Sequence, residues 1–102
     1  MVEDRIICSL KEQARELRAD ILKMLNKAAS GHTGGSLSVV DIITALYFYK
    51  MRHDPSEPGW RERDRFILSK GHGAPALYAA LARSGYFDYK EIFTLRRLKS
   101  IL

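Results

Sequence analysis

The chain of 102 residues has a single cysteine, Cys8, and no apolar run long enough to cross a membrane. One cysteine excludes an internal disulfide and a zinc site built from paired cysteines, and it favours a reducing, cytoplasmic setting. The N-terminal stretch turns polar and acidic within a few residues and lacks a small-residue cleavage site, so no signal peptide is expected. We therefore expect a cytoplasmic protein that does not contact a membrane.

Charge of neither sign dominates the sequence. Its 17 basic and 12 acidic residues give a net charge of +5, spread along the chain. Such a balance suits an anionic ligand, nucleic acid or merely a soluble surface, and it selects none of these. With 46% hydrophobic residues, the chain can build one core but not two, so one domain or part of one is expected.

Two helices are predicted in the first half. Apolar residues recur at steps of three and four from about residue 3 to residue 29, which predicts one long amphipathic helix. Asp20 is spaced to pair with the lysine one turn later, so we expect it on a solvated face. A second helix over roughly residues 39–50 is apolar on most sides and should be buried. Ser38, three residues before Asp41, favours a capping box at its start.

The second half predicts one strand and two helices. The apolar run at residues 66–68 is typical of a strand covered on both faces, as in a parallel sheet. In the helix that follows, Pro75 suits the first turn and Gly85 the C-terminal stop, and Asp88 can cap a further helix. The expected fold class is therefore α/β in the order α-α-β-α-α, mostly helical with one parallel-type strand. The apolar, untapered final residues indicate an incomplete domain.

Two glycine clusters each precede a predicted helix: GHTGG at residues 31–35 and KGHG at residues 70–73. Free N–H groups and the positive end of the helix dipole meet at such a start, and glycine lets a phosphate approach the backbone. His32 and His72 could each add a hydrogen bond or transfer a proton. Neither cluster matches a P-loop or a dinucleotide motif. Glycines that only turn the chain, with surface histidines and an ordinary exposed Lys70, remain the alternative.

Other assignments have less support. The three histidines match no structural zinc pattern, so no residue is assigned as a metal ligand, and His53 is interpreted as a turn residue. A small basic helical module that binds nucleic acid or another protein remains the alternative function. This alternative is supported only by the positive net charge, because the sequence shows neither a helix-turn-helix pattern nor aromatic residues alternating with basic ones. Its candidate contacts are Arg61, Arg63, Arg96, Arg97 and Lys99.

Longer stretches around both glycine clusters carry a family resemblance. SGHTGGSLSVVDIITALYF and DRFILSKGHGAPALYAALARSGYF resemble the opening segment of transketolases, especially the N-terminal subunit of split transketolases. The similarity runs from about Ala14 to the last residue. It implies that residues 1–102 form an incomplete N-terminal portion of the α/β domain that binds the diphosphate of thiamine diphosphate.

The resemblance also implies roles for single residues. His72, with Gly71 and Gly73 admitting the ligand, is similar to the family histidine that contacts the cofactor diphosphate. His32 is similar to the histidine that faces the sugar near the reactive carbon, which makes it the implied catalytic and substrate-binding residue. Many family members have proline at the position of Thr33, so His32 is expected to be held slightly less rigidly here.

The implied reaction transfers a two-carbon ketol unit from a ketose phosphate to an aldose phosphate, as in the pentose phosphate pathway, and its chemistry belongs to the cofactor. The family's Gly-His-Pro loop, its magnesium-binding Gly-Asp-Gly run and its pyrimidine-binding domain do not occur in this sequence. The complete enzyme is therefore expected to combine thiamine diphosphate, Mg²⁺, a second copy and a C-terminal transketolase subunit. We expect these 102 residues alone neither to hold the cofactor stably nor to turn over sugar phosphates.

Overall fold

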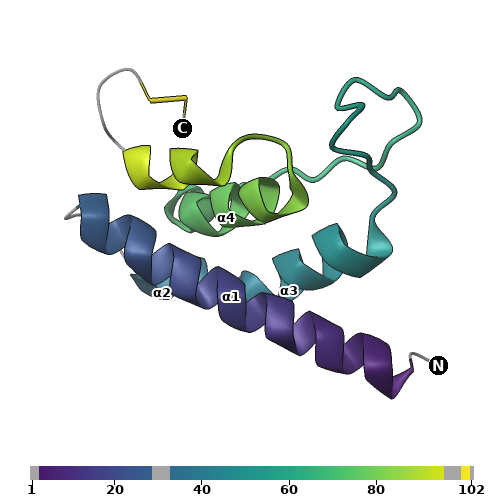
Figure 1. Cartoon of the computed structure of the whole chain (residues 1–102), viewed down its shortest axis with the longest axis horizontal. Coiled ribbons are helices and arrows are strands. Elements are labelled where there is room, and N and C mark those ends of the chain that lie inside the picture. The colour runs from purple at the N-terminus through teal and green to yellow at the C-terminus, as the bar shows by residue number, and fades with distance from the viewer. Residues whose placement is uncertain (1–2, 29–32, 96–99, 102) are drawn as a thin grey trace.

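The computed structural model describes residues 3–28, 33–95 and 100–101, and the structural statements below refer to these residues. Helix α1 crosses the whole length of the molecule, and the other elements lie along it (Figure 1). The elements, in chain order, are α1 (Asp4–Ala28), α2 (Thr33–Leu37), α3 (Val40–Ala45), the π-helical turn η1 (Leu46–Lys50), the 3₁₀ turn η2 (Gly71–Gly73), α4 (Ala74–Ser84) and the 3₁₀ helix η3 (Tyr89–Thr94).

The core forms where α1 packs against α3, α4 and η3. Leu17, Ile21 and Met24 lie on one face of α1 and are fully buried, as the apolar periodicity predicts. Helix α4 meets them with small side chains, Ala76 and Ala79, which are also fully buried. Because helix spacing depends on the side chains at the contact, these alanines allow α4 to approach α1 closely. The predicted long helix is confirmed to within one residue at each end.

The prediction that Asp20 lies on a solvated face of α1 is wrong. Its carboxylate is fully buried and accepts hydrogen bonds from Arg83 Nε at 2.7 Å, Arg83 Nη2 at 3.0 Å and the Tyr89 hydroxyl at 2.6 Å. The hydrogen bonds to Asp20 raise the pKa of Arg83 above its ordinary value. The predicted pairing of Asp20 with the lysine one turn later is also wrong, because this side of α1 faces α4 and η3. The Asp20 cluster, defined as Asp20, Arg83 and Tyr89, therefore joins three elements.

The predicted second helix is present as α3 followed by η1, but its burial is one-sided. Val40, Ile43 and Tyr47 lie in the core, whereas Ile42 is 62% exposed. Its predicted capping box is wrong, since no side chain caps α3. Ser38 Oγ instead donates to the Gly35 carbonyl oxygen at 3.2 Å.

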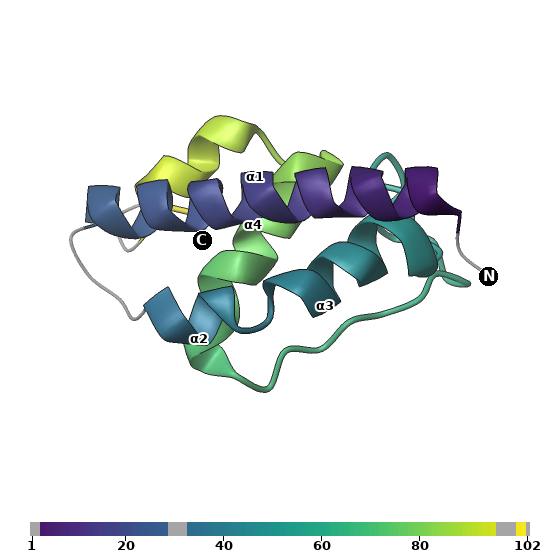
Figure 2. The same cartoon turned by 90° about the horizontal axis from the view of Figure 1, so that it is seen from below.

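The prediction of an α/β fold with one parallel-type strand is wrong for this structure, because its described residues contain no strand. Residues 64–70 cross the molecule without helix, as the long trace below α3 in Figure 2 shows, and Ile67 is 85% exposed. A strand exists only when a neighbouring strand completes its hydrogen-bond ladder. An apolar run can favour the extended backbone, but it cannot supply that partner.

The local signals in the last third are confirmed. Pro75 lies in the first turn of α4, and Gly85 ends that helix in the left-handed region with φ of 100°. The Asp88 side chain accepts a hydrogen bond from the Lys90 backbone N–H and caps η3. Within residues 3–28, 33–95 and 100–101, none of the helices has both the length and the apolar character needed to span a bilayer.

Candidate functional site

The segments that carry the two glycine clusters lie side by side. Helix α2 contacts both η2 and the start of α4, and Figure 2 shows these elements together at one end of the molecule. Lys70 Nζ donates to Ser38 Oγ at 2.5 Å, which links the two segments directly. The structure therefore brings the two glycine segments to one place. The prediction that the first cluster is a loop before a helix is wrong for Gly34 and Gly35, which lie within α2.

The glycines at this junction serve two different purposes. Gly73 is buried, and a Cβ added there would lie 3.5 Å from both the Gly35 carbonyl oxygen and a methyl group of Val39. Glycine at this position therefore lets two backbone segments pack closely. Gly71 is exposed, and a Cβ added there would meet nothing within 4 Å. Open space thus remains on the side of η2 that carries Gly71.

The start of α4 has the character of an anion site. Gly73 is its N-cap residue, no side chain caps it, and Pro75 lies in its first turn. The first turn carries the positive end of the helix dipole. The backbone N–H groups of Gly73 and Ala74 already donate to the carbonyl oxygens of Lys70 and Gly71, and Pro75 has no N–H. Lys70, three residues before this N-cap, adds a positive charge and forms no ion pair within the described residues. The helix dipole and the lysine charge both favour an anion here, and a diphosphate is such a group.

The two loop histidines are placed only in part. The backbone of His72 lies in η2, between Gly71 and Gly73, and its side chain lies outside the described part. His32 lies outside the described residues altogether, immediately before the first residue of α2. The roles of both imidazoles therefore stay predictions.

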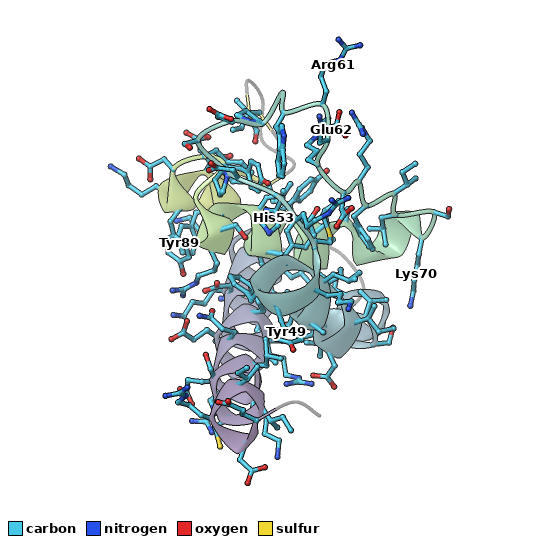
Figure 3. The ribbon with its side chains drawn as sticks, turned by 90° about the vertical axis from the view of Figure 1, so that its right-hand side faces the viewer. Tyr49, His53, Arg61, Glu62, Lys70 and Tyr89 are labelled. Carbon is cyan, nitrogen blue, oxygen red and sulfur yellow. The ribbon has the colours of Figure 1, made fainter. Side chains whose placement is uncertain are left out.

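Sequence reasoning missed the Lys70–Ser38 hydrogen bond. Lys70 was interpreted as an ordinary exposed lysine, and Ser38 was assigned to a helix cap. The Lys70 side chain points down from the extended segment in Figure 3. No sequence signal joins residues that lie 32 positions apart.

His53, interpreted as a turn residue, is used structurally at both ring nitrogens. Its Nε2 lies 2.7 Å from the Tyr47 carbonyl oxygen, and its Nδ1 lies 2.6 Å from the Tyr86 hydroxyl. A carbonyl oxygen can only accept, so Nε2 carries the proton and Nδ1 accepts from Tyr86. His53 therefore links η1 to the segment after α4, and it is no part of the glycine junction.

The remaining sequence candidates gain little from the structure. Of the five residues proposed for nucleic acid, Arg61 and Arg63 lie in the loop before the extended segment. The other three, Arg96, Arg97 and Lys99, lie outside the described residues, so that alternative is not tested. In the part of the chain that the structure describes, no group of three or more His, Cys, Asp or Glu side chains could hold a metal ion.

Comparisons with known proteins give one consistent result. Residues 9–101 match the family model described as transketolase, thiamine diphosphate binding domain. The chain is 52% identical over 93 residues to a 6-deoxy-6-sulfo-D-fructose transketolase subunit of Clostridium sp. (strain MSTE9), which covers 91% of the chain and 34% of that protein. It is 40% identical over 94 residues to an apulose-4-phosphate transketolase subunit of Phocaeicola vulgatus, which covers 92% of the chain and 34% of that protein.

A single-chain relative extends the comparison. The chain is 38% identical over 94 residues to the transketolase of Homo sapiens, with 92% of the chain and 15% of that protein covered. The chain thus spans about a third of the length of the subunit relatives (34%) and a smaller share of the single-chain enzyme (15%).

Proposed function

Because the chain belongs to the family of the transketolase thiamine diphosphate binding domain, we propose that residues 1–102 are an N-terminal portion of that domain in a split transketolase. Two relatives, at 52% and 40% identity, are named as subunits, which supports the split form. The chain matches 34% of each of them, which supports a portion rather than a whole domain.

The cofactor diphosphate lies, in this proposal, at the start of α4, beside Gly71, His72 and Gly73. The observation that carries the proposal is the junction of the two glycine segments, with Lys70 Nζ 2.5 Å from Ser38 Oγ at the uncapped start of α4. The positive end of the α4 dipole and the lysine charge favour an anion there. The exposed Gly71 leaves room for the diphosphate to approach.

His32 faces the sugar in this proposal, because it precedes the segment that packs against η2. Its imidazole would bond substrate hydroxyls and hold or release a proton there. Bound thiamine diphosphate supplies the carbanion chemistry that moves a two-carbon ketol unit from a ketose phosphate to an aldose phosphate. The complete cytoplasmic enzyme also takes Mg²⁺, a second copy and a C-terminal subunit, and the 102 residues alone are inactive.

A segment exchange tests the proposal. Residues 9–101 replace the matching segment of the Clostridium relative, and the chimera is mixed with the C-terminal subunit of that enzyme. In this background, His72→Ala should weaken thiamine diphosphate binding by about tenfold or more, since a hydrogen bond to a charged group is lost. His32→Ala should leave cofactor affinity unchanged and lower kcat by about 10² to 10⁴. Calorimetry measures the first effect and steady-state kinetics the second.

Lys11→Ala serves as the control, because Lys11 is exposed in the first half of α1, away from the end of that helix that leads to His32. It should change neither quantity. Unchanged cofactor affinity in His72→Ala would contradict the site. Ketol transfer by the 102-residue chain, with cofactor and Mg²⁺ added, would contradict its proposed inactivity.

A further inference from the structure

A cavity of about 190 Å³ lies at the opposite end of α4 from the glycine junction. Leu81 of α4 and Tyr86 after it line one side, whereas Gly73 precedes the first residue of α4. Since a helix rises about 1.5 Å per residue, the eight residues from Gly73 to Leu81 separate the two places by roughly 12 Å. The cavity therefore does not belong to the proposed cofactor site.

Positive charge dominates the lining of this cavity. Arg63 and Arg65 supply two cationic side chains, and Asp64 supplies one carboxylate. Both oxygens of that carboxylate already accept hydrogen bonds from Arg52. Asp64 Oδ2 accepts one from the Arg52 backbone N–H at 2.8 Å, and Asp64 Oδ1 accepts one from Arg52 Nη2 at 3.1 Å. These hydrogen bonds lower the pKa of Asp64 and keep it ionised beside Arg52. Within the described residues, Arg63 and Arg65 form no ion pair.

Both guanidinium groups keep hydrogen-bond donors free. Arg63 Nη1 donates to the Trp60 carbonyl oxygen at 2.6 Å, which fixes its position. Its Nε and Nη2 hydrogens have no partner among the described residues. Arg65 Nη1 makes only long contacts, at 3.4 Å, to two carbonyl oxygens of the same loop. A guanidinium presents its donors as a planar fork that matches two oxygens of a phosphate.

Tyr86 gives the cavity a rigid, neutral wall. Its hydroxyl donates to His53 Nδ1 at 2.6 Å, and the two rings stack with centroids 5.7 Å apart. Burial raises the pKa of Tyr86 above its ordinary value, so the phenol stays neutral. Because the hydroxyl hydrogen of Tyr86 is used in the hydrogen bond to His53, Tyr86 does not donate to a ligand. The donors available to an anion are therefore the two arginines.

We propose that this cavity binds the phosphate group of a small molecule, with Arg63 and Arg65 as its ligands. Its volume of about 190 Å³ is many times the roughly 15 Å³ that one water molecule needs, which leaves room for a phosphate and a short carbon chain. Apolar side chains of Phe66 and Leu81 line the cavity as well and suit the carbon part. The site is independent of the proposed cofactor site and of ketol transfer.

A phosphate titration of the 102-residue chain tests this site. Inorganic phosphate is added at constant ionic strength, with sodium chloride as the balancing salt, and the backbone amide shifts of Phe66, Leu81 and Tyr86 are followed by NMR. Saturating shifts are expected in the native chain. Arg63→Gln and Arg65→Gln should each weaken the affinity by about tenfold or more, because each removes charge-assisted hydrogen bonds. Circular dichroism shows that each variant is folded.

Arg61→Gln is the matched control, because it makes the same change of charge in the same loop. Arg61 extends away from the molecule in Figure 3 and does not line the cavity. Its substitution should leave the affinity unchanged. Equal weakening by Arg61→Gln, shifts that grow linearly without saturation, or shifts centred on residues 70–73 would each overturn the proposal.

A second arm identifies the source of the phosphate. Glycerol 3-phosphate is titrated in the same way as inorganic phosphate. Tighter binding of the ester assigns the cavity to a phosphorylated metabolite, and tighter binding of inorganic phosphate assigns it to the free ion. Either result supports a phosphate site, and failure of both ligands to saturate refutes it.

Discussion

The assembly of α1, α4 and η3 and the segment at residues 51–70 are held in place by different means. In the assembly, fully buried side chains such as Leu17 and Ile21 meet across helices, and the Asp20 cluster adds a buried ionic link. Residues 51–70 contain no residue classed as buried, and Ile67 is 85% exposed. Polar contacts at its beginning, from His53 and from the Arg52–Asp64 pair, fix this segment instead.

The difference separates the part whose buried contacts stabilise the fold from the part that carries residues of the two proposed sites. The segment ends at η2, and the proposed phosphate cavity lies along it. Binding residues commonly lie on connecting segments that a rigid scaffold positions. Here the helices supply the scaffold, and the segment presents Arg61, Arg63, Arg65 and Lys70, which form no ion pair within the described residues.

The sharpest way to test this comparison is to remove one apolar side chain from each region. Leu17→Ala should lower the free energy of unfolding by about 2–5 kcal/mol, because it leaves a cavity in the core. Ile67→Ala should change it by less than about 0.5 kcal/mol, since that side chain is already in water. Urea unfolding followed by circular dichroism measures both. Similar losses in the two variants would show that the segment is packed after all.

A smaller effect is expected at the ionic link. Asp20→Asn should cost about 2 kcal/mol, because hydrogen bonds to a buried carboxylate are weakened. The Arg83 side chain is 32% exposed, so water recovers part of the loss. Glu12→Gln breaks the exposed pair with Arg15, whose atoms lie 3.3 Å apart, and should cost less than about 0.5 kcal/mol. If both variants lost equally little in urea unfolding, the Asp20 cluster would be no stronger than a surface pair.

Apart from the control variants, the smallest loss of stability is expected at Gly85, which ends α4 beside the segment. Its φ of 100° is unfavourable for any side chain, although a Cβ would meet only Pro55 at 3.8 Å. Gly85→Ala should therefore cost about 1 kcal/mol through the backbone alone. Gly59→Ala provides the control, because a Cβ there meets nothing within 4 Å and no positive φ is required. Thermal unfolding should show a lowered Tm only for the first variant.

The features that the sequence predicted correctly are local ones. Periodicity located α1 and the helix formed by α3 and η1, because a buried stripe repeats with the helical turn. Pro75, Gly85 and Asp88 were placed correctly because their preferences depend on the backbone of neighbouring residues.

The errors all required knowledge of distant partners. Asp20 binds residues 63 and 69 positions away, which no spacing rule within α1 reveals. Ser38 binds Lys70 rather than a helix end for the same reason. The run at residues 66–68 lacks the neighbour that a strand needs. The glycine clusters were identified from sequence, but their contact could only be found in three dimensions.

The exposed path of residues 64–70 has a consequence for proteolysis. Arg65 and Lys70 both present accessible basic side chains there, on chain that is not held in a helix. A protease that cuts after basic residues should therefore cut at these two positions before it cuts within α1 or α4. The two fragments should stay associated in solution. Helix α1 in the N-terminal fragment packs against α4 and η3 in the C-terminal fragment, and Asp20 accepts a hydrogen bond from Arg83.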